Sequence, residues 1–354
     1  YLGRHPEKPQ DLAVKVLPFH MAERDPVLVE RFFREAQIAM KIKSPHLVSV
    51  YDAREEQGLY YIVMEFVSGM SAGAYLKKTR ASGLDEAEAL QICIAATQGL
   101  IAAHGEGIIH RDVKPDNILV PLDSAGKLLF SAAKLADLGL ARSEEHGNSL
   151  TGSQASMGTP GYMSPEQAMD ARKCGKPADI FSMGACLYAL LCGRPPFHGK
   201  APMEVVMMTV NQPHEPLASL RPNVSPAVAA LVERCLHKDP QYRFKDSDAL
   251  LSGLKLCRSV LGKPAAEQSR AVEELRGRQV IRESAPQPHF NELTIESGAR
   301  PRRPHLLRAH LRQGFRAHLR HPPAPESSRT PRPARGRPGA IQKVRRRTAP
   351  HLRL

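Results

Sequence analysis

Three side chains suited to phosphoryl transfer lie within the stretch HRDVKPDNILV, residues 110–120. Asp112 is followed by Lys114 and Asn117, and an apolar segment comes directly afterwards. Phosphoryl transfer needs a carboxylate that orients the attacking hydroxyl and accepts its proton, a cation near the moving phosphoryl group, and oxygen ligands for Mg²⁺. A lone aspartate in a loop is usually a solvated surface residue, but here Asp112, Lys114 and Asn117 supply all of these parts together.

A second carboxylate occurs at Asp137, within KLADLGLAR, residues 134–142. The apolar residues before it favour a short strand, and Gly139 allows the chain to turn sharply away. A carboxylate at the tip of a strand is a suitable hard oxygen ligand for Mg²⁺. An isolated Asp-Leu-Gly is a weak signal, but its position twenty residues after Asn117 strengthens it.

A lysine that could reach nucleotide phosphates is Lys15, in the strand-like stretch AVK, residues 13–15. A lysine in the middle of a strand usually lies on a solvated face. Glu35, however, borders an apolar stripe in the next predicted helix, formed by Leu28, Phe32, Ala36 and Met40. A Lys15–Glu35 pair between strand and helix could hold the lysine against the phosphates.

The elements that must position these residues form two sections. The first is a small sheet with a helix from Pro26, and its predicted strands are residues 11–17, 46–53 and 59–66. The second is mostly helical, with short strands at about 117–120 and 134–137 and predicted helices at 85–104, 178–192, 202–210, 226–236 and 246–257. The apolar helix 178–192 has 15 residues and is therefore better explained as a buried core helix than as a membrane span.

The motifs occur in the order of the protein-kinase signature, and the chain resembles the protein kinase family from its first residue to about Leu256. The sequences GTPGYMSPEQ (158–167) and CLHKDPQYRF (235–244) are most similar to those of the bacterial eukaryote-like serine/threonine kinases. The resemblance implies an α+β, two-lobed fold. Its parts would be a small, truncated β-rich N-lobe over residues 1–66 and a mainly helical C-lobe over residues 67–256.

The resemblance also implies ATP and Mg²⁺ as cofactors. Asp112 would be the catalytic base, Lys114 would stabilise the transferring phosphoryl group, and Asn117 and Asp137 would bind Mg²⁺. Lys15 would contact the α- and β-phosphates and pair with Glu35. The residues implied around the adenine ring are Ala13 and Leu119 on its two faces, Met64 as gatekeeper, and Glu65 to Val67 as the hinge.

Other implied roles are structural or regulatory. Glu166 would form a buried ion pair with Arg243, and Asp179 would hold the backbone of the catalytic loop. Arg111, beside the base, suggests control by a phosphate in the activation loop, at about residues 140–165. The best candidate sites for autophosphorylation are Thr151 and Ser153, with Ser149 and Ser156 as weaker ones.

The implied substrates are proteins that present serine or threonine. The position of Lys114 in its loop, together with Thr159 before Pro160, resembles the pattern of kinases that act on serine and threonine hydroxyls. A small-molecule phosphotransferase of related fold is an alternative, because it could also carry an Asp and an Asn at similar spacing. The segment 158–167 favours a protein kinase, because in that family it forms a platform for a peptide substrate.

Two departures from the family pattern stand out. No glycine-rich phosphate loop precedes Lys15, so we expect weakened ATP binding and an exposed sheet edge. The alternative function is then a catalytically weak or inactive kinase-like scaffold. Adding a glycine-rich segment should raise ATP affinity, and equal affinities with and without it would contradict this expectation.

The second departure is the long connection PLDSAGKLLFSAA, residues 121–133, which we interpret as an extended hairpin.

Composition excludes several classes of protein. Apolar residues make up 42% and charged residues 24%, no apolar run has the length of a membrane helix, and the six cysteines form no CxxC pair. We therefore expect a cytoplasmic protein without a transmembrane segment, a disulfide scaffold or a zinc site.

The net charge of +14 has a single origin. Residues 300–354 contain 15 Arg and one Lys against one acid, so the rest of the chain is nearly neutral. This Arg-, Pro- and His-rich tail has no hydrophobic periodicity, and we expect it to be disordered. It could bind anions weakly and without specificity. Residues 257–299 are predicted to be a polar linker, with one possible exposed helix at about 265–283.

Overall fold

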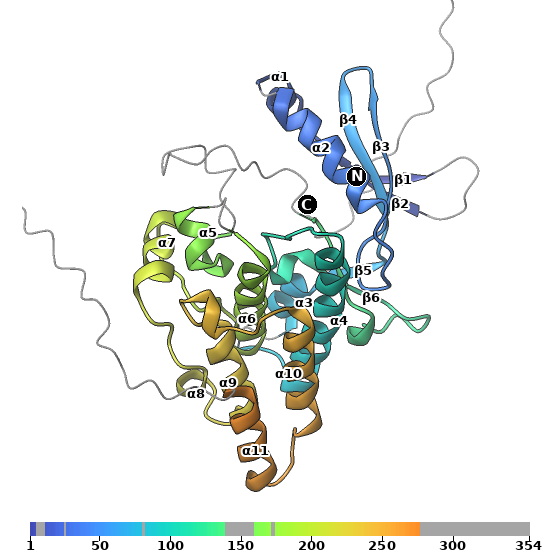
Figure 1. Cartoon of the computed structure of the whole chain (residues 1–354). Helices are drawn as coiled ribbons and strands as arrows, with labels where there is room; N and C mark the ends of the chain where they lie inside the picture. Colours follow the sequence, from blue (N-terminus) through green and yellow to red (C-terminus); the bar gives the residue numbers. More distant parts are fainter. Residues whose placement is uncertain (5–10, 25, 80–81, 139–158, 171–173, 277–354) are drawn as a thin grey trace, which may run out of the picture. The chain divides into compact units, whose positions relative to one another are not determined.

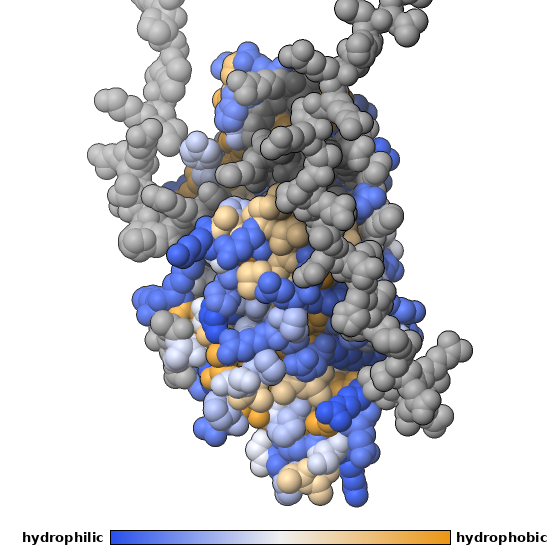
Figure 2. Space-filling model, turned by 90° about the vertical axis from the view of Figure 1, so that its left-hand side faces the viewer, coloured by the Kyte–Doolittle hydropathy of each residue, from blue (hydrophilic) through white to orange (hydrophobic). Residues whose placement is uncertain are grey.

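The computed structural model describes residues 1–4, 11–24, 26–79, 82–138, 159–170 and 174–276. Two antiparallel sheets and a larger helical part make up these residues (Figure 1). In the described part of the chain, no helix combines the length and the apolar character needed to cross a bilayer. On the face shown in Figure 2, hydrophilic residues predominate and apolar ones form small patches.

The first sheet is antiparallel and has the order β1-β2-β4-β3. Its strands are β1 (Leu2–Arg4), β2 (Asp11–Val16), β3 (Val50–Glu56) and β4 (Leu59–Glu65). Strand β1 lies at one edge, and β2 pairs with β4 so that Lys15 is opposite Ile62. Helices α1 (Phe19–Arg24) and α2 (Pro26–Ala39) follow β2, and α2 buries Phe32 and Ala36. This arrangement fixes the backbone on both sides of Lys15.

Strand β3 begins later than the sequence predicts. The predicted strand covers 46–53, but the structure gives 50–56. Before β3 the chain pairs elsewhere, because Leu135 N–H donates to His46 O at 2.8 Å and Val48 N–H donates to Leu135 O at 2.9 Å. The apolar residues near Leu47 therefore connect the first sheet to the strand that precedes Asp137.

The second sheet has the order β5-β6-β7 and carries the segments on either side of the predicted catalytic residues. Its strands are β5 (Gly69–Ser71), β6 (Ile118–Pro121) and β7 (Lys134–Leu135). The connection between β6 and β7 pairs back on itself, since Leu122 bridges Leu128 and Asp123 Oδ1 accepts from Ala125 N and Lys127 N. The predicted hairpin is confirmed, and it ends in a 3-10 turn in which Phe130 packs against Tyr75.

The helical part is built around two long apolar helices, α4 (Glu86–Gly105) and α6 (Lys176–Cys192). Nearly every residue of α6 is buried, and the helix ends at Gly193 in the left-handed conformation (φ 79°). The other helices of this part are α3 (Ala72–Thr79), α5 (Pro165–Met169), α7 (Pro202–Asn211), α8 (Leu217–Leu220), α9 (Pro226–Cys235) and α10 (Ser247–Ser259). Helices α6 and α9 approach so closely that a Cβ at Gly184 would lie 2.3 Å from that of Cys235.

The six cysteines are all free, as their scattered positions predict. Burial raises the pKa of Cys93 to about 12 and that of Cys257 to about 12. These thiols therefore stay protonated at neutral pH and act as small apolar side chains in the core.

The folded part extends beyond Leu256, where the sequence predicts its end. Helix α11 (Ala265–Arg276) buries Ala271 and Leu275 and packs on α9. Arg234 fixes this contact, since its Nη1 donates to Leu275 O at 2.7 Å. The helix was predicted as exposed within a linker because most of its residues are polar, and only a narrow stripe faces inward. The predicted tail, residues 300–354, lies outside the described residues.

Candidate active site

The three predicted catalytic-loop residues are brought together around Asp112. The Nδ2 atom of Asn117 donates to the backbone carbonyl of Asp112 at 2.8 Å and to its Oδ2 at 3.0 Å. The ammonium of Lys114 lies 3.1 Å from the same Oδ2. A 3-10 turn, Pro115–Asn117, returns the chain so that Asn117 faces the aspartate. The carboxylate is thus oriented by one amide and one ammonium group.

Lys114 also connects Asp112 to a second segment. Its Nζ donates to Thr159 Oγ1 at 2.8 Å. A small pocket beside Asp112 is lined by Arg111, Asp112, Val113, Thr159, Tyr162, Met163 and Ser182. Lys114 therefore joins two residues of the pocket lining, the Asp112 carboxylate and the Thr159 hydroxyl.

Asp137 stands at the end of β7 and faces the first sheet. Its Oδ1 lies 2.6 Å from the Nζ of Lys15, and both side chains are about one third exposed, at 30% and 33%. The structure shows an ion pair between Lys15 and Asp137. The predicted Lys15–Glu35 pair stays a prediction. Glu35 lies half-buried on α2, with its Oε2 shielded from solvent. A cation bound at Asp137 would compete directly with Lys15 for this carboxylate.

His110 joins the loop of Asp112 to the segment of Asp137. Its Nδ1 accepts from the Asp112 N–H at 3.3 Å, and its Nε2 donates to Ala136 O at 3.0 Å. Burial lowers the pKa of His110, despite the opposing effect of Asp179, so the ring is neutral and carries its proton on Nε2. Asp137 has a φ of 58°, a left-handed conformation that needs such support in a residue other than glycine.

Asp179, on α6, binds the backbone of the catalytic loop, as the resemblance implies. Its Oδ2 accepts from His110 N and its Oδ1 accepts from Arg111 N, both at 2.8 Å. The carboxylate is fully buried, and His104 Nε2 lies a further 2.8 Å from Oδ2. Arg111 has a φ of 63°, so Asp179 restrains the backbone where it is strained.

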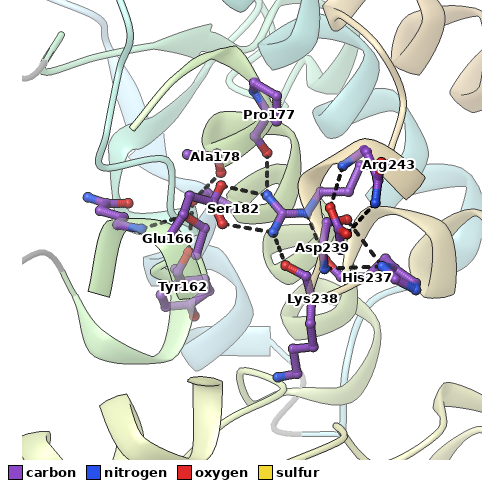
Figure 3. A network of polar contacts seen from close by, with 12 residues as sticks. Tyr162, Glu166, Pro177, Ala178, Ser182, His237, Lys238, Asp239 and Arg243 are labelled. Atoms are coloured by element: carbon purple, nitrogen blue, oxygen red, sulfur yellow. Dashed lines mark hydrogen bonds and ion pairs between the residues drawn. The ribbon is translucent and has the colours of Figure 1, made fainter. Parts of the chain in front are cut away.

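The predicted Glu166–Arg243 ion pair is also confirmed (Figure 3). Two parallel hydrogen bonds of 2.7 and 2.8 Å join the guanidinium to the carboxylate. Arg243 also donates to the carbonyls of Pro177 and Lys238 at 2.8 and 2.9 Å. One buried cation therefore connects α5, the start of α6 and the segment before α10.

The residues implied around adenine lie on both sheets and in the connection that follows β4. Ala13 is opposite Met64 in the β2–β4 register, and Leu119 is half-buried on β6. Glu65 ends β4, and its carboxylate is 2.8 Å from Lys134 Nζ and accepts from Ser49 N at 3.2 Å. Val67 is half-buried in the connection that follows.

Comparison with known proteins agrees with this geometry. Residues 1–252 match the family description "Protein kinase domain". The chain belongs to the protein kinase family. The serine/threonine-protein kinase PknB of Mycolicibacterium smegmatis is 36% identical over 72% of the chain and 40% of its own length. The serine/threonine-protein kinase PrkC of Bacillus subtilis is 33% identical over 70% of the chain and 36% of its own length.

The solved structures agree on the fold of this chain. The PknI kinase domain of Mycobacterium tuberculosis has a TM-score of 0.57 and 27% identity, and the match covers 73% of this chain and 90% of that chain. The two-lobed fold, with an antiparallel sheet and a mostly helical part, is thereby confirmed. The chain spans about two fifths of the length of the PknB and PrkC relatives.

Three residues that support the candidate site carry no signal in the sequence. Lys134 pairs with Glu65, His104 contacts Asp179, and Gln167 Nε2 donates to Arg111 O at 2.8 Å. Each contact joins residues at least 56 positions apart, so no local pattern signals it. The predicted phosphorylation sites Ser149, Thr151, Ser153 and Ser156 lie outside the described residues, as does Gly139.

Proposed function

We propose that the chain is a serine/threonine protein kinase, which transfers the γ-phosphoryl group of ATP to hydroxyl groups of proteins. The observation that carries the proposal is the arrangement at Asp112, whose carboxylate is oriented by Asn117 and contacted by Lys114. The segment that begins at Thr159 supports a protein substrate, because the resemblance implies that it forms a platform for a peptide, and the Thr159 hydroxyl contacts Lys114.

The residues present suit a magnesium-bound nucleotide. Asp137 and Asn117 offer hard oxygen atoms, and Ala136 N–H donates to Asn117 O at 2.8 Å, which keeps the two segments adjacent. No group of three or more acidic, histidine or cysteine side chains in the described residues could enclose a metal. The two ligands Asp137 and Asn117 suit Mg²⁺, which usually binds one or two protein carboxylates and completes its coordination shell with phosphates and water.

Each group in the site has a distinct role in the proposed reaction. Asp112 would accept the proton of the attacking hydroxyl, and Lys114 would place positive charge beside the moving phosphoryl group. Lys15, which lies 2.6 Å from Asp137, would contact the nucleotide phosphates when a cation bound at Asp137 competes with it for the carboxylate. ATP with Mg²⁺, when bound, supplies the activated phosphoryl group and neutralises its charge.

Two finer proposals accompany the function. The substrates would be proteins with accessible serine or threonine, and Thr151 or Ser153 of this chain would be autophosphorylated. The rival proposals are a weakly active kinase-like scaffold and a small-molecule phosphotransferase. The intact Asp112 arrangement favours a catalyst over a scaffold. The segment 158–167, which resembles the peptide platform of protein kinases, favours a protein substrate over a small molecule.

The test is transfer of labelled phosphate from ATP to the chain itself and to a mixture of unstructured proteins. Removal of Mg²⁺ with a chelator should abolish transfer. Asp137→Asn should lower transfer about 100-fold at limiting Mg²⁺, because one negative ligand is lost, and excess Mg²⁺ should restore part of it. Unchanged Mg²⁺ dependence in Asp137→Asn, or no transfer by the unmodified chain, would contradict the proposal.

A further inference from the structure

Three buried polar side chains form a continuous path from α10 to the catalytic loop. Ser247 Oγ lies 2.8 Å from Nδ1 of His104, and Nε2 of the same ring lies 2.8 Å from Asp179 Oδ2. The three residues are 2%, 5% and 0% exposed. They come from α10, α4 and α6, so one path of hydrogen bonds joins three helices.

The direction of these hydrogen bonds follows from Asp179. A carboxylate only accepts, so His104 must present a protonated Nε2 to it. His104 Nδ1 then faces the Ser247 hydroxyl, which can donate to it. The first turn of α10 is capped by Asp246, whose carboxylate accepts from Ala249 N at 2.8 Å. The Ser247 hydroxyl is therefore not needed as a cap and is available to His104.

The order serine, histidine, aspartate resembles a hydrolytic triad, but burial excludes that role. With Ser247 2% exposed, its hydroxyl cannot meet a substrate. The contacts of Asp179, at the other end of the path from Ser247, indicate the role of the path. Asp179 restrains the amides of His110 and Arg111 at 2.8 Å, and Arg111 has a φ of 63°. Asp112 follows directly.

We propose that Ser247 is a positioning residue for catalysis. It holds the His104 ring with Nε2–H toward Asp179, and Asp179 in turn holds the strained backbone that presents Asp112 to Asn117 and Lys114. Without the hydroxyl, the ring has no partner at Nδ1 within this path and can turn or move its proton to that atom. Asp179 then loses one of its donors. This inference rests on the proposed kinase activity.

The kinetic test compares Ser247→Ala with the unmodified chain. We expect kcat to fall about fivefold, as for the loss of one buried hydrogen bond, while KM for ATP stays unchanged because Lys15 and the hinge lie outside the path. Ser247→Thr keeps the hydroxyl and should retain most of the activity. Ser252→Ala is the matched control, since Ser252 lies on the same helix and bonds to Asp248 O in an exposed position.

The outcomes separate positioning from general destabilisation. Rates are measured far below the unfolding transition of every variant, with the folded fraction determined by circular dichroism. An unchanged kcat in Ser247→Ala, or a fall that Ser252→Ala reproduces, would overturn the inference. If the unmodified chain transfers no phosphate, the proposed function fails.

A second measurement does not need activity. In ¹⁵N-histidine-labelled protein, long-range proton–nitrogen spectra report which ring nitrogen carries the proton, and the His104 signal is the one lost in His104→Gln. We expect a proton on Nε2 in the unmodified chain and a changed Nδ1 shift in Ser247→Ala. A ring protonated on Nδ1 alone would overturn the inference even in an inactive chain.

Discussion

Replacement of Asp112 by asparagine is expected to lower kcat for phosphate transfer about 1,000-fold. Asparagine has nearly the same shape, so the hydrogen bond to Asn117 Nδ2 can be kept through the amide oxygen. The substituted side chain, however, cannot accept a proton from the attacking hydroxyl. It also removes the charge that lies 3.1 Å from Lys114 Nζ. The measurement is steady-state transfer of labelled phosphate from ATP at saturating Mg²⁺.

Asp116→Asn is the matched control for this prediction. Asp116 belongs to the same loop, but it is half exposed and lies 3.5 Å from the exposed Lys77. A surface pair of this kind contributes little, so its loss should change kcat less than about twofold. Equal effects of the two substitutions would show that charge in the loop, rather than proton acceptance at Asp112, carries the activity.

The KM for ATP provides a further check on Asp112→Asn. Asp112 contacts groups within its own loop, whereas Lys15 and the residues implied around adenine lie elsewhere. KM for ATP should therefore stay within about threefold of its original value, as expected when an interaction made mainly in the transition state is removed. A large rise in KM with unchanged kcat would instead assign Asp112 to nucleotide binding.

Contacts between residues that are close along the chain can be predicted from the sequence, whereas contacts between distant residues cannot. Asp112, Lys114 and Asn117 lie within six residues, and a single 3-10 turn brings them together, so their motif predicts their geometry. Lys15 and Asp137 are separated by 122 residues. Their ion pair depends on how the two sheets meet, which neither local sequence encodes.

The same reasoning explains the fold elements that were missed or misplaced. Long apolar helices such as α4 and α6 have a strong hydrophobic pattern, and both were predicted to within two residues at each end. Helix α11 buries only one narrow stripe, so its polar composition concealed its packing on α9. The path through Ser247 and His104 could not be predicted at all, because it spans 143 residues and a hydroxyl can bond to many partners.

The largest expected loss of stability is for Arg243→Met, at about 3–5 kcal/mol in the free energy of unfolding. The guanidinium is fully buried and pairs with Glu166 through two hydrogen bonds. It also lies 4.9 Å from the centre of the Phe181 ring. Methionine can keep the packing, but it leaves the Glu166 carboxylate and the bonded carbonyls without their donor. Urea denaturation followed by circular dichroism measures the loss.

Arg194→Met is the surface control for this ion pair. Arg194 lies 2.7 Å from Glu215, a distance as short as that in the buried pair, but both side chains are more than one third exposed. Its loss should cost less than about 1 kcal/mol, because water and salt screen the exposed charges. Similar losses for the two arginines would show that burial does not set the strength of the Glu166–Arg243 pair.

The double variant Glu166→Gln, Arg243→Met separates the pair itself from the cost of leaving a charge unpaired. If most of the loss in Arg243→Met comes from the uncompensated Glu166 carboxylate, the double variant should recover about 1–3 kcal/mol relative to Arg243→Met alone. Arg243→Met should also lower catalytic activity, because α5 carries Gln167, which donates to Arg111 O in the catalytic loop. The double variant should regain part of that activity. A double variant no more stable than Arg243→Met would instead assign the loss to the carbonyls of Pro177, His237 and Lys238.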